Sequence, residues 1–340
     1  MPTQESAPRF SPRRSLALAA IVVVCFFAGL EVVLRLVGVE STTETPRILA
    51  RQMDVDITFP FMHGDPELFW SPVPGFEGEF LGKRLRVNRL GLRGPEPPQA
   101  RGPGTRRVVC FGDSITFGYG VGEDETYSHY LGQRLAPRGV AVVNAGVTGY
   151  TSHQVLGLLQ RVGPALQPDV VTVLICWNDQ NRRHSTDRSY QARFRQAAAI
   201  AATLDHLYLY RAISAGYRAL ARSGARRPTP RDTVRVLPDE YRENLERIVA
   251  VCVALGAKPA FIAFTGRHAR GQAAPEGRYP GILAEVARAH GVAVLDSGPL
   301  AATAPDGNEP LFIDSLHFSP AGAELLAREL AAQLLARGIV

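Results

Sequence analysis

Three side chains that together can perform nucleophilic catalysis occur in this sequence, Ser114, Asp314 and His317. A serine hydroxyl is a weak nucleophile and needs a neighbouring base. Imidazole is the usual base, and a carboxylate commonly holds it in the required tautomer. Because Asp314 precedes His317 by three residues, its carboxylate can reach the Nδ1 side of the ring within one turn of chain. The residue types therefore predict a nucleophile at Ser114, a base at His317 and an orienting acid at Asp314.

Acyl transfer through a serine also requires hydrogen-bond donors directed at the oxyanion of the tetrahedral intermediate. The candidates are the backbone N–H groups of Ser114 and Gly146 and the side-chain amide of Asn178. Gly146, which has no side chain, would let a substrate approach the backbone closely. Taken singly, Gly-Asp-Ser is an ordinary turn and Asn-Asp an ordinary strand end. The joint placement of all these residues favours a catalytic site.

Five short apolar runs predict the strands that position these residues. They lie at residues 107–111, 140–144, 170–176, 259–264 and 292–296. Continuous apolar runs of this kind are typical of parallel strands covered on both faces. Ligands of such sheets bind outside the carboxyl ends of the strands, and Ser114, Gly146 and Asn178 each follow or end a run.

Helical patterns alternate with these runs, at about residues 124–137, 151–163, 238–256 and 278–290. A last one, at about 320–337, begins after Ser319-Pro320, which is a helix start signal. Alternating strands and helices predict an α/β fold, a three-layer α/β/α sandwich with a parallel sheet of about five strands.

Four short blocks resemble the SGNH, or GDSL, hydrolase family and occur in the order typical of that family. They are residues 111–116 (FGDSIT), 144–146 (NAG), 178–179 (ND) and 314–317 (DSLH), and the resemblance covers about residues 106–338. It implies a flavodoxin-like sandwich and a Ser-His-Asp ester hydrolase without a metal ion. Carried over block by block, it places the nucleophile at Ser114, oxyanion donors at Gly146 and Asn178, and the acid and base at Asp314 and His317.

One position departs from the family pattern. The third block usually begins with a glycine two residues before the asparagine, where this chain has Cys176. This puts in doubt the shape of the pocket wall beside Trp177 but removes no catalytic group.

The segment before the first strand carries a second, weaker resemblance. Trp70, Pro74-Gly75 and residues 87–94 (VNRLGLRG) are similar to bacterial membrane-anchored SGNH proteins. Some members of that group, such as alginate O-acetyltransferase-like proteins, modify envelope polysaccharides. Asn88 and Arg93 could line the site, although we favour a structural brace.

The N-terminal region predicts a membrane anchor. Residues 15–30 contain no charge, and the apolar character continues past Glu31 and Arg35 to residue 39. A helix of this length can cross a hydrocarbon core of about 30 Å, and Glu31 and Arg35 can pair because they are four residues apart. Arginines precede the run, so we expect the N-terminus inside the cell and the rest outside. A cleaved signal peptide and a buried core helix are the alternatives.

The expected organisation has four parts. Residues 1–14 form a basic cytoplasmic tail, 15–39 a transmembrane anchor, 40–105 a linker and irregular lead-in, and 106–340 the hydrolase domain with a helical insertion at about 182–236. Within the insertion, Leu207, Tyr210, Ile213 and Tyr217 occur at helical spacing. We favour a cover on the core there over a lid or a membrane-facing helix.

Composition excludes several function classes. The 340 residues are 46% hydrophobic and 21% charged, which excludes a disordered chain or a multi-span transporter. The net charge of +6 comes from scattered arginines, so we expect no nucleic acid partner. No metal-ligand spacing or nucleotide-binding loop occurs, so we expect neither a metal ion nor a cofactor.

We therefore expect a bacterial serine esterase that hydrolyses carboxylic esters, with a short acyl or acetyl group, outside the cytoplasmic membrane. The substrate would be such an ester, including an acylated glycan. Three alternatives stay open: an O-acetyltransferase acting on envelope polysaccharide, a lipase or thioesterase, and a non-catalytic envelope binding protein.

Overall fold

The structure is a computed structural model. It describes residues 12–39, 59–97, 104–175, 177–223, 233–263, 278–297, 310–314 and 316–340. The chain divides into two compact units, Met1–Thr45 with Gln196–Pro228, and Pro46–Arg195 with Thr229–Val340.

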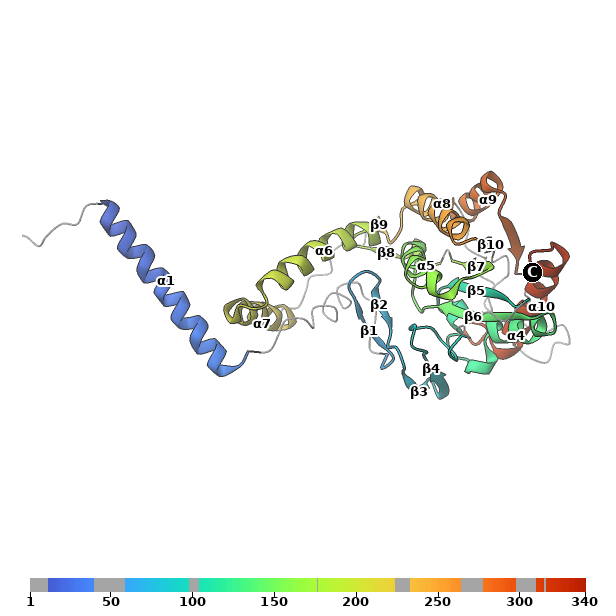
Figure 1. The fold of residues 1–340 in the computed structure, drawn as a ribbon, viewed down its shortest axis with the longest axis horizontal. Helices are drawn as coiled ribbons and strands as arrows, with labels where there is room; N and C mark the ends of the chain where they lie inside the picture. Colours follow the sequence, from blue (N-terminus) through green and yellow to red (C-terminus); the bar gives the residue numbers. More distant parts are fainter. Residues whose placement is uncertain are drawn as a thin grey trace, which may run out of the picture. The chain divides into compact units, whose positions relative to one another are not determined.

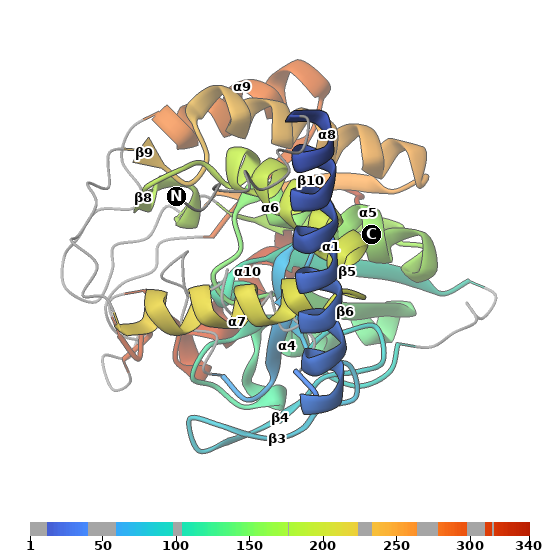
Figure 2. The same ribbon diagram turned by 90° about the vertical axis from the view of Figure 1, so that its left-hand side faces the viewer.

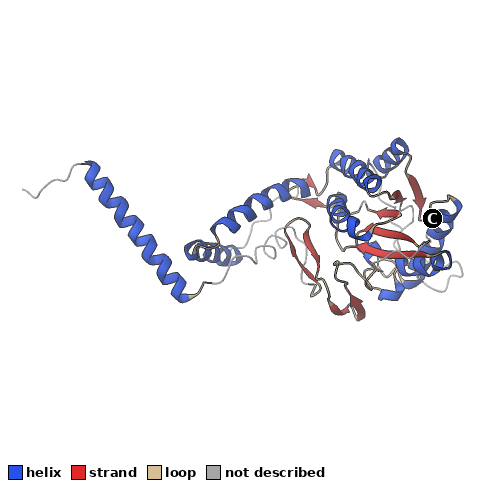
Figure 3. Ribbon diagram, viewed as in Figure 1, coloured by secondary structure: helices blue, strands red, loops and turns tan. Residues whose placement is uncertain are grey.

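A five-stranded sheet forms the centre of the larger unit (Figures 1 and 3). Its strands are β5 (Arg106–Gly112), β6 (Val140–Gly146), β7 (Val170–Leu174), β10 (Lys258–Ala263) and β11 (Ala293–Asp296). They lie in the order β11-β10-β7-β5-β6, and each neighbouring pair is parallel. The predicted parallel sheet is therefore confirmed. The direction of winding reverses between β5 and β7, which is where sheets of this type bind ligands.

Helices cover both faces of the sheet, because successive side chains of a buried strand point to opposite sides. Val109 and Phe111 of β5 belong to one core, with α5 (Ser152–Leu166), α8 (Pro238–Ala254) and α9 (Arg278–His290). Val108 and Cys110 belong to the other core, with α4 (Tyr127–Leu135) and α10 (Pro320–Ala336). The three-layer α/β/α architecture is confirmed.

Two predicted helices have different limits in the structure. The pattern at 124–137 is divided into η2 (Glu123–Glu125), α4 and η3 (Ala136–Arg138). The division comes at Thr126, which is extended and caps α4 by accepting the N–H of His129. The helix predicted to end at 163 continues through Pro164 to Leu166 as α5. Leu159 and Val162 of this helix belong to the core.

Two short antiparallel hairpins precede the sheet, where the sequence pattern indicated no strand. They are β1 (Met62–Asp65) with β2 (Phe69–Pro72), and β3 (Glu77–Phe80) with β4 (Lys83–Arg86). The first hairpin is hydrogen-bonded to the loop after β6. The Trp70 indole N–H donates to Thr148 O, and the Tyr150 hydroxyl donates to Trp70 O. Four-residue strands are too short to show a periodic pattern, which is why sequence analysis missed them.

The smaller unit contains α1 (Pro12–Val37), α7 (Tyr208–Ser223) and the last residues of α6 (Asp187–Leu204). Of the described helices, α1 alone is long and apolar enough to cross a membrane, with a mean hydropathy of 2.7. It has no buried residue. The predicted pair forms, since Arg35 Nε lies 3.0 Å from a Glu31 carboxylate oxygen.

Candidate active site

Ser114 lies where β5 ends and α3 (Ser114–Phe117) begins. Asp113 caps this helix, because its Oδ1 accepts the N–H of Ile115 at 3.0 Å. Gly112 is required by close packing, since an added Cβ would lie 2.2 Å from Thr116 Oγ1 and 2.6 Å from Leu174 O. The Gly-Asp-Ser turn therefore places the Ser114 hydroxyl at the carboxyl edge of the sheet.

The structure brings Ser114, His317 and Asp314 together in one hydrogen-bonded chain. His317 Nε2 lies 2.9 Å from Ser114 Oγ, and His317 Nδ1 lies 2.7 Å from Asp314 Oδ2. An ionised carboxylate can only accept, so Nδ1 carries the proton and Nε2 is left to accept from the serine hydroxyl. This is the arrangement that a serine nucleophile and its base require.

The Asp314 carboxylate also holds the chain around His317. Its Oδ1 accepts the backbone N–H groups of Leu316 and His317, each at 2.7 Å. Partial burial acts to raise the pKa of Asp314, but hydrogen bonds from the His317 side chain and from the two backbone N–H groups outweigh it and lower the pKa. The group is therefore an anion at neutral pH.

Tyr119 is a site residue that sequence analysis did not identify. Its ring lies over the His317 imidazole, with centroids 4.4 Å apart and planes 30° apart, and it also makes an edge-to-face contact with the Phe80 ring. Since no motif includes position 119, only its position five residues after Ser114 could have drawn attention to it.

Gly146 has a structural role in addition to the one the sequence suggested. Its N–H donates to Asn144 Oδ1 at 2.9 Å, so this donor already has an acceptor. An added Cβ would lie 2.2 Å from Phe117 N, which means that close packing against α3 requires glycine here. Asn144 in turn donates from Nδ2 to Thr116 O at 2.8 Å. The pair Asn144 and Gly146 thus supports the helix that carries Ser114.

A second glycine, Gly149 in the loop that follows β6, is a further candidate donor. Its φ is +80°, and its N–H has no acceptor among the residues that the structure describes. The next residue, Tyr150, accepts Asn178 Nδ2 at 3.0 Å, so Gly149 lies close to the predicted oxyanion donor Asn178. Sequence analysis noted no role for Gly149; its place as the last glycine of the loop after β6 was the available signal.

Asn178 begins η4 (Asn178–Gln180), directly after β7. Besides Tyr150 O, its Nδ2 contacts Asp113 Oδ2 at 3.3 Å, the longer of the two bonds. Burial raises the pKa of Asp113 to about 7, and the nearby Asp179 carboxyl adds to this. Protonation of Asp113 would weaken the longer bond and make the Asn178 amide available to an oxyanion. Cys176, where the sequence departs from the family pattern, lies outside the described residues.

Asp179, the residue after Asn178, is fully buried. Its Oδ1 accepts both the N–H and the hydroxyl of Ser152, at 2.9 and 2.5 Å. Burial raises the pKa of Asp179 to about 6. In the described part of the chain, no group of three or more His, Cys, Asp and Glu side chains is placed to hold a metal ion.

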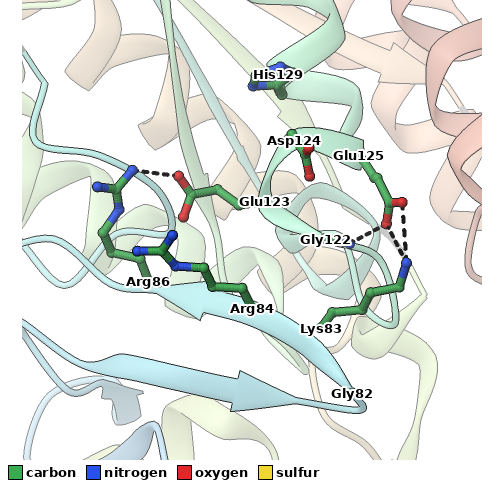
Figure 4. A pocket seen from close by; sticks show the side chains of 9 residues that line it. All are labelled: Gly82, Lys83, Arg84, Arg86, Gly122, Glu123, Asp124, Glu125 and His129. Atoms are coloured by element: carbon green, nitrogen blue, oxygen red, sulfur yellow. Dashed lines mark hydrogen bonds and ion pairs between the residues drawn. The ribbon is translucent and has the colours of Figure 1, made fainter.

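Two cavities lie near the loop that follows α3. The first, of about 10 Å³, is lined in part by Ser114, Tyr119 and His317. The second, of about 420 Å³, lies between the β3–β4 hairpin and η2 and is lined mainly by charged side chains (Figure 4). Ion pairs cross this charged pocket, Lys83 with Glu125 at 3.0 Å and Arg86 with Glu123 at 2.6 Å.

Sequence comparison places this chain in a known family. The profile of the GDSL-like Lipase/Acylhydrolase family matches residues 110–325, well over half of the chain. The chain belongs to this family. It is therefore a hydrolase of the class that cleaves ester bonds, and the match spans Ser114, Asn178 and His317.

Several solved structures are similar to this chain at low sequence identity. They include the lipase/acylhydrolase from Enterococcus faecalis (24% identity, 68% of this chain and 97% of that chain covered, TM-score 0.41). The psychrotrophic esterase EstA from Pseudoalteromonas sp. is 14% identical, with 68% and 98% covered and a TM-score of 0.42. The acetyl xylan esterase AlAXEase is 16% identical, with 67% and 99% covered and a TM-score of 0.42. Among curated protein sequences, none matches this chain significantly.

Proposed function

We propose that this GDSL-family hydrolase is a serine esterase that cleaves short-chain acyl esters, with Ser114 as its nucleophile. The observation that carries the proposal is the unbroken chain of hydrogen bonds from Ser114 Oγ to His317 Nε2, at 2.9 Å, and from His317 Nδ1 to Asp314 Oδ2, at 2.7 Å.

In the first half of the reaction, Ser114 Oγ attacks the ester carbonyl carbon while His317 Nε2 takes the hydroxyl proton. The resulting imidazolium is stabilised by the Asp314 carboxylate, which stays ionised. The oxyanion accepts hydrogen bonds from the backbone N–H of Ser114 and the side-chain amide of Asn178. We add the Gly149 N–H, which has no acceptor in the described part of the chain, in place of the Gly146 N–H, which Asn144 occupies.

In the second half, the intermediate collapses and His317 returns the proton to the departing alkoxide, leaving an acyl group on Ser114. Water then attacks the acyl carbon, with Nε2 again accepting a proton. The carboxylic acid leaves, and Ser114 recovers its hydroxyl hydrogen. Tyr119 restricts the imidazole throughout, because its ring covers one face of His317.

The preference for a short acyl group rests on the space beside the nucleophile. The cavity that Ser114 shares with Tyr119 and His317 has about 10 Å³, close to the smallest volume that holds a single water molecule. An acyl chain directed to this side must therefore be short. The charged pocket begins at η2, which follows the same loop, and its polar lining suits a polar alcohol component better than a lipid.

We further propose that α1 anchors the protein in the cytoplasmic membrane, with the catalytic unit on the outer side. The 26-residue helix is about 39 Å long at 1.5 Å per residue, which exceeds a hydrocarbon core of about 30 Å. Its complete lack of buried residues agrees with a helix whose apolar surface contacts lipid.

Hydrolysis of p-nitrophenyl acetate by the full chain in detergent micelles tests the catalytic proposal. The full chain is required because residues 196–223 form one compact unit with α1. We expect Ser114→Ala to reduce kcat by at least about three orders of magnitude, since the hydroxyl that forms the acyl-enzyme is lost.

Ser189→Ala provides the matched control. Ser189 is an exposed serine at the beginning of α6, and its loss should leave the rate unchanged. Equal rates for the wild-type and Ser114→Ala proteins, both folded, would refute Ser114 as the nucleophile. Rates compared for acetyl and long-chain esters then test the preference for short acyl groups.

A further inference from the structure

Helix α7 begins at a side chain of α1. The Glu31 carboxylate accepts the N–H groups of Tyr208 and Leu209, the first two residues of α7, at 2.9 and 2.8 Å. These N–H groups have no acceptor inside the helix, and a carboxylate also favours the positive end of the helix dipole. The start of α7 is therefore fixed at the level of Glu31.

Two arginines strengthen this connection. Arg35 donates to the Glu31 carboxylate at 3.0 Å and to His206 O at 3.3 Å. Its guanidinium lies 5.4 Å from the centre of the Tyr208 ring, and that of Arg211 lies 4.5 Å from it. Figure 2 shows that α7 runs across the direction of α1 instead of continuing along it.

Glu31 lies at the C-terminal end of the apolar segment of α1. Residues 15–30 carry no charge, and Glu31 and Arg35 are the first charged residues that follow. In an anchored protein, the beginning of α7 therefore lies at the boundary between hydrocarbon and headgroups, and α7 runs across the anchor near this boundary.

The two sides of α7 differ in character. Leu209 and Ile213 are four residues apart, on one side, and the Ile213 side chain is 63% exposed. Arg211 lies about 160° around the helix from both, at 100° per residue.

A contact of Arg211 shows which side is turned away from the hydrocarbon. Its Nη1 donates to Val39 O, and Val39 follows the end of α1, beyond Glu31 and away from the apolar run. The Arg211 side is thus turned toward the aqueous end of α1. The opposite side, with Leu209 and Ile213, is turned toward the apolar span.

We infer that α7 is a membrane-surface helix, which lies in the outer boundary of the bilayer with Leu209 and Ile213 in contact with acyl chains and Arg211 at the lipid headgroups. This inference rests on the proposed membrane anchoring by α1. Amphipathic helices with an apolar side and a basic side bind in this way, and anionic lipids increase their affinity. The inference takes up the membrane-facing helix that sequence analysis named as an alternative to the favoured cover on the core.

Spin labels on the full chain in vesicles of phosphatidylethanolamine and phosphatidylglycerol test the inference. Single cysteines replace Ile213 on the apolar side, Ala215 near Arg211 as the matched control, and Val22 in α1, with Cys25 and Cys176 changed to alanine. Collision with apolar O₂ and with a water-soluble nickel chelate is then measured. We expect the ratio of O₂ to nickel collisions to be severalfold higher at position 213 than at position 215, and highest at position 22.

The label in α1 separates the two possible failures. A high ratio at position 22 with equal low ratios at positions 213 and 215 would overturn the surface helix while leaving the anchor intact. A low ratio at position 22 would overturn the anchor, and the inference with it. A high ratio at positions 22 and 213 together with a low ratio at 215 supports both.

Discussion

At the scale of single residues, Asp314 holds His317 through two different oxygen atoms. Oδ1 accepts the backbone N–H groups of residues 316 and 317, and Oδ2 accepts the imidazole N–H. The carboxylate therefore determines both where the imidazole lies and which of its nitrogens is protonated. This division of roles leads to a specific expectation for the amide analogue.

We expect Asp314→Asn to reduce kcat for p-nitrophenyl acetate by about three to four orders of magnitude with little change in KM. The amide oxygen would replace Oδ1 at the two backbone N–H groups, which leaves the NH₂ group facing Nδ1. The imidazole would then be protonated at Nε2 and could not accept the Ser114 proton. Steady-state kinetics of the purified variant measure this.

Glu243→Gln is a suitable control for that variant, since it removes an exposed carboxylate from α8 without contacting His317. A kcat for Asp314→Asn within tenfold of this control would contradict the assigned tautomer.

At the scale of elements, the segment before the sheet stabilises the loop that follows α3, the helix that begins with Ser114. Arg93 is 4% exposed and donates to Phe117 O, Gly118 O and Val121 O at 2.6–2.7 Å. Its guanidinium also lies 4.7 Å from the centre of the Phe117 ring, and burial lowers the pKa of Arg93 to about 10. The structural brace favoured for Arg93 is thus present. Its hydrogen bonds hold the chain on both sides of Tyr119, whose ring covers His317.

We expect Arg93→Met to lower both the melting temperature and kcat. Three buried carbonyl groups would lose their donor, at a cost of about 1–3 kcal/mol for each, and the loop carrying Tyr119 would be less well held. Differential scanning fluorimetry and ester hydrolysis measure the two effects.

Arg89→Met is the matched control for Arg93→Met. The Arg89 side chain is 87% exposed, and its Nε lies 3.9 Å from Glu96. If the two variants melt at the same temperature, Arg93 does not stabilise the loop.

At the scale of the whole molecule, the arginines before α1 predict its orientation. Arg9, Arg13 and Arg14 precede the apolar run, and loops rich in Arg and Lys stay in the cytoplasm. The rest of the chain would then lie outside, where an envelope ester can reach Ser114.

We expect alkaline phosphatase fused after residue 340 to be active and green fluorescent protein at the same position to be dark. Phosphatase requires the oxidising exterior for its disulfides. Bright fluorescence with inactive phosphatase would reverse the proposed orientation. An intact N-terminus on the membrane-bound protein, found by mass spectrometry, would separate the anchor from a cleaved signal peptide.

The sequence by itself determined the α/β alternation and predicted the three residues that the structure joins in one hydrogen-bonded chain. Apolar runs and helical periodicity are local patterns, because burial on a strand or a helix repeats every two or every 3.6 residues. Ser114 was found through its turn, and Asp314 and His317 through their spacing of three. The domain limits at residues 40, 106, 182 and 236 stay predictions.

Only the tertiary structure decided how distant segments complete the site. The Arg93 brace, the ring of Tyr119 over His317 and the Asn144 acceptor for Gly146 depend on how separate elements pack. Glu31 meets α7 across 177 residues of sequence. Contacts of this kind leave no periodic signal, because their geometry depends on the folded positions of both partners and not on their spacing along the chain.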